Sequence, residues 1–302
     1  MNLKTGLKSQ LLMNKSKTPI IAIVGPTASG KTSLGIAIAK LIGGEILCCD
    51  SRTVYKGMTI GTSAPSQKEQ SGIPHHLLEI REPDKQINAA QFKEICLSTI
   101  ENIKSRGKIP ILVGGSGLYI DSIIFNYSYE PQDTVLRDSL ANKTLDELQK
   151  IISEKNLELP INEKNPRHLI SAIMNKGRDK DRELIDDCLV IGVSVDREVL
   201  VSSIKARTER MIKQGLETEV RALVDQYGWD IEPMRSIGYM EFKGYIENKI
   251  NIEELKALIN KDTFNYAKRQ KTWFKRNKNI HWIEEQGEVV DLITTYLNKY
   301  GI

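Results

Sequence analysis

One eight-residue segment restricts the possible folds of this chain more than any other feature. Residues 25–32 read GPTASGKT and fit the pattern G-x-x-x-x-G-K-[ST]. The apolar run 19–24 (PIIAIV) precedes the segment, and residues 33–42 follow it with apolar side chains at helical spacing. A strand, a glycine-rich loop and a helix in this order direct backbone N–H groups and a helix N-terminus toward an anion. The segment therefore predicts a phosphate-binding loop in an α/β fold.

The side chains of this loop have separate expected roles. Lys31 supplies a full positive charge, and the hydroxyl of Thr32 can reach Mg²⁺, which makes magnesium the expected cofactor and Thr32 its expected protein ligand. The residues expected to bind a diphosphate or nucleotide are Gly25, Pro26, Thr27, Ala28, Ser29, Gly30, Lys31 and Thr32.

Two further apolar runs predict buried strands. Residues 45–49 (EILCC) lead to Asp50, and residues 109–113 (IPILV) lead to Gly114. Helix-length segments such as 89–105 separate the runs, which indicates a parallel sheet flanked by helices. Ligands of such sheets bind beyond the carboxyl ends of the strands, so we expect Asp50 next to the phosphate loop. There its carboxylate can accept a proton from a nucleophile, although a turn or helix-capping aspartate would fit the sequence too.

The third strand lacks a residue that many phosphate-loop enzymes have. A P-loop ATPase or GTPase usually has a strand that ends in an aspartate, which helps to hold Mg²⁺. Here the run 109–113 continues into Gly114, Gly115 and Ser116. The pattern favours a diphosphate cradle without the usual NTPase switch.

The chain of 302 residues is predicted to contain a core with an insertion. Residues 1–18 form a basic N-terminal tail, residues 19–125 and 188–302 the α/β core, and residues 126–187 a helical insertion. The expected helices of the insertion span 144–154 and 166–176. A strand is expected at 189–195, and further helices at 197–214, 216–227, 252–259 and 262–276.

Charge is unevenly distributed along the sequence. The formal net charge is only +4, but residues 261–278 hold seven basic residues against one acidic residue, and residues 1–18 hold four lysines and no acid. Such runs are usually solvated surfaces, and the alternative is a surface for nucleic acid. Four cysteines without C-x-x-C spacing, and no apolar run long enough to span a membrane, predict a cytoplasmic protein that makes no membrane contact.

Seven segments together resemble the tRNA dimethylallyltransferase family, also called tRNA isopentenyltransferases. The segments are GPTASGKT at 25–32, DSRTVY at 50–55, GT at 61–62, PHHL at 74–77, GGSGLY at 114–119, RSIGYME at 235–241 and YAKRQKTWFK at 266–275. The resemblance implies a P-loop NTPase-like fold whose loop holds dimethylallyl diphosphate. It further implies that the exocyclic amine of the adenosine 3′ of the anticodon attacks the allylic carbon, and that diphosphate leaves.

The resemblance also assigns roles to individual residues. Asp50 is expected to act as the general base, while Lys31, Arg207 and Mg²⁺ near Thr32 stabilise the leaving diphosphate. Ser116 is expected to keep a hydrogen bond near the adenine. The tRNA anticodon stem-loop is the expected macromolecular partner and dimethylallyl diphosphate the expected small-molecule partner of a monomeric enzyme. The residues implied to contact tRNA are Asp50, Ser51, Arg52, Thr53, Ser116, Arg137, Arg167, His168, Leu169, Ile170, Ser171, Arg235, Ser236, Ile237, Gly238, Tyr239 and Met240.

The insertion departs from the family pattern. Ser171 stands where the family usually has a second arginine, and the segment after it lacks the usual hydrophobic and Gly-Lys elements. The contacts expected with the anticodon stem are therefore less well defined than the catalytic positions.

Two other classes of function fit parts of the sequence. A small-molecule kinase would use Asp50 to activate an alcohol toward ATP, and the insertion offers Arg178 and Arg182 for a lid. A nucleic-acid-binding module with a vestigial loop would bind tRNA in a salt-sensitive manner without turnover.

Overall fold

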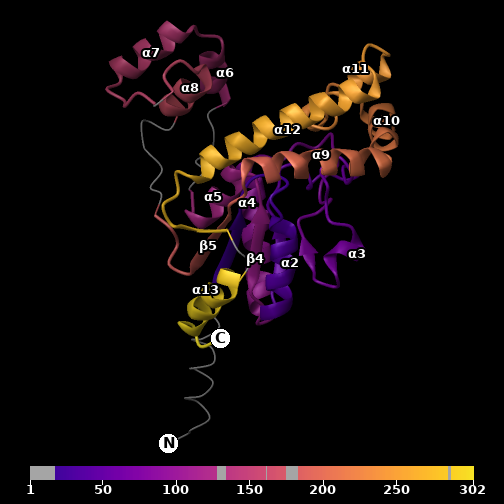
Figure 1. Cartoon of the computed structure of the whole chain (residues 1–302). Coiled ribbons are helices and arrows are strands. Elements are labelled where there is room, and N and C mark those ends of the chain that lie inside the picture. The colour runs from indigo at the N-terminus through magenta and orange to yellow at the C-terminus, as the bar shows by residue number, and fades with distance from the viewer. Residues whose placement is uncertain (1–17, 128–133, 161, 175–182, 285–286) are drawn as a thin grey trace, which may run out of the picture. The chain divides into compact units, whose positions relative to one another are not determined.

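The computed structural model describes residues 18–302 apart from 128–133, 161, 175–182 and 285–286 (Figure 1). It divides into two compact units, of which unit 1 contains the described residues up to Ile124 together with Leu184–Ile302. Unit 2 is Phe125–Glu183, whereas the sequence predicted an insertion at 126–187. All but one residue of the predicted basic tail, and both Arg178 and Arg182, lie outside the described residues.

Unit 1 is built around a six-stranded parallel sheet. Its strands are β1 Ile20–Val24, β2 Glu45–Cys48, β3 His75–His76, β4 Pro110–Gly114, β5 Cys188–Val193 and β6 Ile280–Ile283. They lie in the order β3-β2-β4-β1-β5-β6, and every neighbouring pair is parallel. The central strands are buried on both faces, which explains their continuous apolar sequences. The predicted α/β class is confirmed.

Helices cover both faces of this sheet (Figure 1). The helices of unit 1 are α2 Lys31–Ile42, α3 Gln67–Gln70, α4 Ala89–Ser105, α5 Gly117–Ile124, α9 Arg197–Lys213, α10 Leu216–Tyr227, α11 Phe242–Ile246, α12 Ile252–Phe274 and α13 Gly287–Asn298, with a 3₁₀ turn η1 Glu232–Arg235. Buried side chains of α2 and α13 share one core cluster with alternate residues of the strands. Helices α4 and α5 pack against β4 and against each other, and α9 packs against α12.

The structure corrects several predicted elements. The two helices expected at 252–259 and 262–276 are one helix, α12, because no glycine or proline interrupts residues 252–274 and Asn251 forms a capping box at its start. His75 and His76, of the PHHL segment, form the short edge strand β3 beside β2. Strand β6 and helices α5 and α13 carried no sequence prediction. Strand β6 could not be predicted because its four residues are too few to show an alternating apolar pattern.

Unit 2 consists of three helices with a small core of their own. They are α6 Thr134–Ala141, α7 Leu145–Glu154 and α8 Pro166–Met174. Thr144 and Glu147 form a capping box that starts α7. The buried residues of this core are Leu140, Leu148, Ile152, Leu169 and Ile173. Each such side chain contributes roughly 1.5–3 kcal/mol on burial, so the three helices stabilise one another chiefly through these contacts.

The described residues bear on membrane insertion and on disulfide bonding. None of the helices in the described ranges is long and apolar enough to cross a bilayer. The four cysteines are buried free thiols.

Candidate active site

The carboxyl ends of three adjacent strands bring the phosphate loop, Asp50 and Ser116 to one edge of the sheet. The phosphate loop follows β1, Gly115 and Ser116 follow β4, and Asp50 lies just beyond β2. Because β4 lies between β1 and β2, the strand before Asp50 is not the immediate neighbour of the strand before the phosphate loop. The 115–116 segment lies between them in strand order. The strand order therefore places the loop after β4 between the predicted donor site and the predicted base.

The phosphate loop has the backbone geometry that its sequence predicts. Gly25 has a φ of 151°, and a Cβ at this position would lie 3.0 Å from the carbonyl oxygen of Val193. Gly30 begins helix α2 with a left-handed φ of 87°. Both values favour glycine, since other residues would be strained there. The first N–H groups of α2 consequently point out of the loop toward the position of an anion.

Lys31 is held over this loop by its own backbone. Its Nζ donates a hydrogen bond of 2.7 Å to the carbonyl oxygen of Pro26. Burial lowers the pKa of Lys31 to about 8, partly opposed by the negative charge of Asp50. The hydroxyl of Ser29 is buried without a hydrogen-bond partner in the described structure, while Thr32 is exposed in the first turn of α2. The loop thus presents a cation and two hydroxyl groups for which an anionic ligand would provide partners.

Arg207, on helix α9, lies against the same loop. One guanidinium nitrogen donates to Oγ1 of Thr27 at 2.8 Å, and the other donates to the carbonyl oxygen of Thr62 at 2.9 Å. Burial lowers the pKa of Arg207, and the negative charge of Asp50 opposes this effect. An arginine retains its charge under such a shift because its ordinary pKa is far above neutrality. Arg207 therefore adds a second fixed cation beside the phosphate loop, as the sequence predicted.

Asp50 is half-buried and forms a turn, which is one of the two roles considered for it. Its Oδ1 accepts a hydrogen bond of 2.8 Å from the backbone N–H of Arg52, as in a turn-forming aspartate. Its charge raises the pKa of both Lys31 and Arg207, so the carboxylate lies within electrostatic reach of the loop cations. The turn fixes the carboxyl group, and a fixed carboxylate near two cations is suited to accept a proton in a defined place.

Ser116 ties the segment after β4 to the segment after β2. Its Oγ accepts a hydrogen bond of 2.9 Å from the backbone N–H of Ser51. Burial raises the pKa of Tyr266 on α12 to about 12, and hydrogen bonds with the side chains of Ser116 and Gln270 lessen the shift. The Ser116 hydroxyl is therefore already engaged with the protein on the Asp50 side of the site.

Two residues of this site carried no sequence prediction. Gln270, on α12, accepts from the N–H of Thr27 and donates to the carbonyl oxygen of Gly115. Glu219, on α10, accepts from the N–H groups of Thr59, Ile60 and Gly61 at 2.9, 2.7 and 2.9 Å. It thereby fixes the loop whose Thr62 carbonyl holds Arg207. The available signal for Gln270 was an amide on the mostly apolar buried face of α12.

The candidate tRNA residues of unit 1 fall into exposed and buried groups. Arg235 and Met240 are exposed, whereas Gly238 and Tyr239 are buried, and Ser236 and Ile237 are half-buried. The Tyr239 hydroxyl donates to Glu219 at 2.7 Å, and the N–H of Gly238 donates to Glu241 at 2.8 Å. Within this segment Arg235 and Met240 offer their side chains to a large ligand, and Tyr239 anchors the segment.

The remaining candidates of unit 1 lie near Asp50. Arg52 forms a two-bond ion pair with Glu232 at 2.5 and 2.8 Å, which connects the Asp50 turn to the η1 turn before Arg235. Thr53 is buried, and Ser51 is half-buried. Arg52 therefore has a structural partner already, and a contact with tRNA would add to that pair or replace it.

Unit 2 carries its own set of candidates. Arg137, Arg167, His168 and Ser171 are exposed, and Ile170 is half-buried. Leu169, in contrast, lies in the core of the unit and is 0% exposed, so it presents no surface for a tRNA contact.

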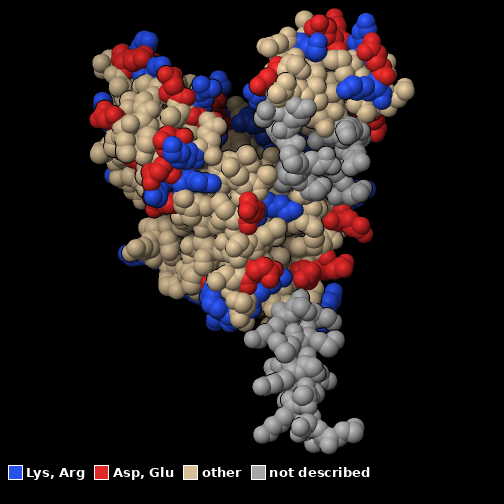
Figure 2. All heavy atoms as spheres, turned by 180° about the vertical axis from the view of Figure 1, so that it is seen from behind, with Lys and Arg blue, Asp and Glu red and all other residues tan. Residues whose placement is uncertain are grey.

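The basic run at 261–278 lies on α12 and the turn after it, and all seven of its basic side chains are exposed. The buried face of the same helix holds Phe274, and Trp273 donates to Asp121 at 2.8 Å, so both aromatic residues pack onto the protein. On the face shown in Figure 2, basic and acidic side chains are interspersed. The charges on this face therefore do not mark a binding surface. The exposed basic residues at 261–278 are the more informative feature.

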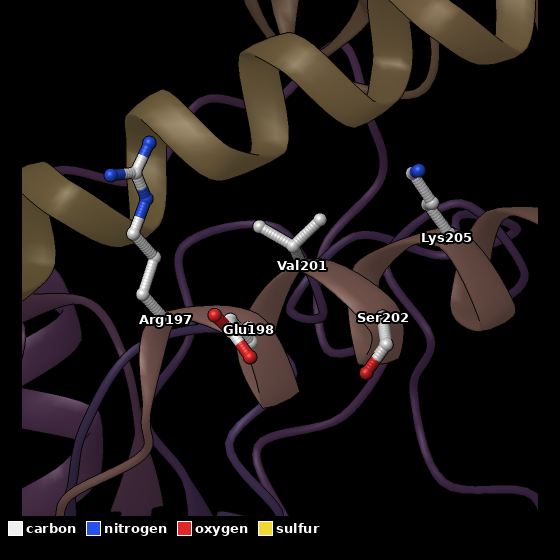
Figure 3. Close-up of a pocket in the computed structure, with 5 residues that line it drawn as sticks. All are labelled: Arg197, Glu198, Val201, Ser202 and Lys205. Atoms are coloured by element: carbon white, nitrogen blue, oxygen red, sulfur yellow. The ribbon is translucent and has the colours of Figure 1, made fainter.

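A shallow pocket lies on α9, on the side that faces α12. Arg197, Glu198, Val201, Ser202 and Lys205 line it, and the side chains of Arg197, Val201 and Lys205 point toward α12 (Figure 3). Arg197 lies over the ring of Phe264 at 5.7 Å. The lining contains neither the loop lysine nor Asp50, and we assign no role in catalysis to this pocket.

The sheet, the loop after β1 and the loop lysine place this chain among the P-loop NTPase-like α/β proteins. Within that class it belongs to the IPP transferase family, whose model matches residues 53–277.

Similar proteins cover nearly the whole chain. A tRNA dimethylallyltransferase of Bacillus licheniformis is 34% identical over 290 residues, covering 90% of this chain and 92% of the relative. One from Staphylococcus aureus is 36% identical, covering 94% of this chain and 100% of the relative. The crystal structure of the tRNA isopentenylpyrophosphate transferase of Bacillus halodurans matches with a TM-score of 0.73 and 30% identity, over 94% of this chain and 98% of that one. A eukaryotic dimethylallyltransferase acting on tRNA shares the fold with a TM-score of 0.73 at 23% identity, over 88% of this chain and 73% of that one.

Proposed function

We propose that this protein transfers a dimethylallyl group from dimethylallyl diphosphate to the exocyclic amine of the adenosine 3′ of the anticodon in tRNA. Family membership and relatives named tRNA dimethylallyltransferase support the reaction class. The observation that carries the chemistry is the placement of Asp50 within electrostatic reach of Lys31 and Arg207 at the phosphate loop. The kinase alternative is not favoured, because the chain belongs to a transferase family of another kind and β4 ends in glycine where many P-loop enzymes have an aspartate.

The reaction joins the adenine nitrogen to the allylic carbon and breaks the bond from that carbon to the diphosphate oxygen. An amine attached to an aromatic ring is a weak nucleophile, so removal of its proton as the bond forms lowers the barrier. Asp50 is the proposed acceptor of this proton, since its Oδ1 is fixed by the N–H of Arg52. The proton passes to the carboxylate, and the bonding electron pair leaves with the diphosphate.

Negative charge grows on the diphosphate as it departs. Lys31 and Arg207 are fixed near the loop before the reaction begins, through Pro26 on one side and Thr27 and Thr62 on the other. Cations held in place stabilise the developing charge without reorganising, and they act more strongly on the transition state than on the bound donor.

The donor atoms near the loop fit Mg²⁺. Thr32 offers an exposed hydroxyl oxygen, and in the described ranges no group of three His, Cys, Asp or Glu side chains could hold a metal. Magnesium typically retains water and binds through phosphate oxygens, so Thr32 is the proposed protein ligand. When bound, the ion would neutralise charge on the diphosphate.

We propose that the tRNA contacts come from the exposed residues of each unit. In unit 1 these are Arg235, Met240 and the basic residues of α12, and in unit 2 they are Arg137, Arg167, His168 and Ser171. Single-stranded loops of RNA let one base leave the stack and enter a pocket, which suits an anticodon loop. The enzyme is proposed to act as a cytoplasmic monomer.

Transfer of labelled dimethylallyl group tests the proposal. Two tRNA transcripts that differ only in the base 3′ of the anticodon, adenosine or guanosine, would be incubated with protein, Mg²⁺ and labelled dimethylallyl diphosphate. We expect label only in the adenosine transcript. Label in neither transcript, or equal label in both, would contradict the proposed reaction.

A further inference from the structure

The side chain of Gln270 joins two loops that come from different strands. It is buried, and its Oε1 accepts a hydrogen bond of 2.8 Å from the backbone N–H of Thr27, 243 positions away. Its Nε2 donates a bond of 2.9 Å to the carbonyl oxygen of Gly115. An N–H can only donate and a carbonyl can only accept, so these partners fix the orientation of the amide.

The contacts around Gln270 leave little freedom for the loops to move. A Cβ at position 115 would lie 2.2 Å from Nε2 of Gln270, so a larger residue there would displace the Gln270 side chain. Ser116, the next residue along the chain from Gly115, accepts a hydrogen bond of 2.9 Å from the backbone N–H of Ser51. The hydrogen bonds of Gln270 and Ser116, together with the peptide bond between Gly115 and Ser116, therefore connect the phosphate loop to the residue next to Asp50.

This arrangement matters for a transfer between two bound substrates. The donor is proposed to lie on the phosphate loop and the acceptor near Asp50, and strand order puts the 115–116 segment between them. Reacting atoms must approach to roughly 3–3.5 Å, and a misplacement of about 1 Å can cost about 10²-fold in rate. We propose that Gln270 is a positioning residue that holds the phosphate loop and the 115–116 segment in a fixed arrangement. Its side-chain amide accepts a hydrogen bond from the phosphate loop and donates one to the 115–116 segment. The inference rests on the proposed function and adds a residue to it.

The substitution Gln270→Glu separates positioning from simple packing. A protonated carboxyl group reproduces one acceptor and one donor, whereas an ionised one presents two acceptors and repels the carbonyl of Gly115. The charged and titratable groups nearby are Lys31 on α2, Asp50 and Arg52 after β2, Arg207 on α9 and Tyr266 on α12. Measuring the ratio of variant to wild-type kcat at each pH cancels the titration of groups that both proteins share.

We expect the kcat ratio of Gln270→Glu to fall to about 0.01–0.1 at pH 8.5 and to recover at least about fivefold at pH 6. The affinity for inorganic diphosphate should stay within about threefold of wild type. Gln91→Glu is the matched control, because Gln91 occupies a capping-box position on α4 where glutamate serves equally well. Its ratio should stay near one at every pH. A ratio for Gln270→Glu that is flat with pH while the protein remains folded would overturn the proposal.

A second readout does not depend on turnover. In the wild type, inorganic diphosphate should slow amide hydrogen exchange at residues 115–119 as well as in the phosphate loop, since Gln270 links the two. Gln270→Met removes both hydrogen bonds with little change in volume, and protection should then remain in the loop alone. Equal protection at 115–119 in both proteins would refute the link. An inactive wild type that shows the linked protection would instead contradict only the proposed function.

Discussion

Diphosphate binding should weaken above pH 8 because Lys31 must be protonated to attract it. Burial lowers the pKa of this lysine to about 8 in the free protein. A bound anion favours the charged form, so binding takes up a proton whenever the lysine is neutral beforehand. Affinity is therefore full below the lowered pKa and is lost as the pH rises through it.

The size of the effect follows from that value. At pH 7 a lysine with a pKa of about 8 is mostly protonated, and at pH 9 about one tenth is, so the affinity for diphosphate should fall about tenfold between these values. A lysine with its ordinary pKa would produce almost no change in this window.

Titration calorimetry with inorganic diphosphate, in the absence of divalent cations, measures this change. The ligand itself titrates near these pH values, so each affinity is divided by that of Lys31→Met, which has no group to titrate at this position. We expect the ratio of wild-type to variant affinity to fall about tenfold from pH 7 to pH 9. A constant ratio would refute the argument that burial depresses the pKa of Lys31.

Three further substitutions test the remaining parts of the site. Asp50→Asn keeps an acceptor for the N–H of Arg52 but removes the base, so kcat for prenyl transfer should fall about 10²–10⁴-fold while calorimetric diphosphate affinity stays nearly unchanged. An equal loss of kcat and of diphosphate affinity would contradict the role of Asp50 as a base and would make it a binding residue. Glu219→Ala leaves the N–H groups of residues 59–61 without their acceptor and should lower the free energy of unfolding in urea by about 2–4 kcal/mol. The exposed neighbour Glu217→Ala, which loses only a surface pair with Arg221, should cost less than about 1 kcal/mol, and similar losses in both would contradict the role of Glu219. Gly115→Ala should displace Gln270 and reduce kcat about 10–100-fold in single-turnover assays, and unchanged kcat would show that the close approach is not needed.

The sequence predicts the local parts of this fold well because they depend on neighbouring residues. The strand, loop and helix around the phosphate loop, helix α4 and helix α10 follow directly from apolar periodicity and from glycine positions. Helix α12 was predicted as two pieces, although its capping box and its uninterrupted sequence were both visible.

The arrangement of the site depends on contacts that periodicity does not encode. The position of β4 between β1 and β2 is a property of strand order, and it places the segment after β4 between the strand ends that carry Asp50 and the phosphate loop. Gln270 and Glu219 reach partners more than 150 positions away, so the sequence does not show which residues they bind. Strand-end reasoning and the family resemblance both supplied Asp50 as a candidate, the resemblance supplied Arg207, and the structure supplied the residues that hold their surroundings.

The most direct test of the central claim offers the enzyme both donors at once. Wild-type protein, Mg²⁺ and an anticodon stem-loop with adenosine 3′ of the anticodon would receive dimethylallyl diphosphate and ATP in equal amounts, and the digested nucleosides would be identified by mass spectrometry. We expect an adenosine heavier by one dimethylallyl group, released diphosphate, no consumption of ATP, and no product with Asp50→Asn. Consumption of ATP with no prenylated adenosine would contradict the account.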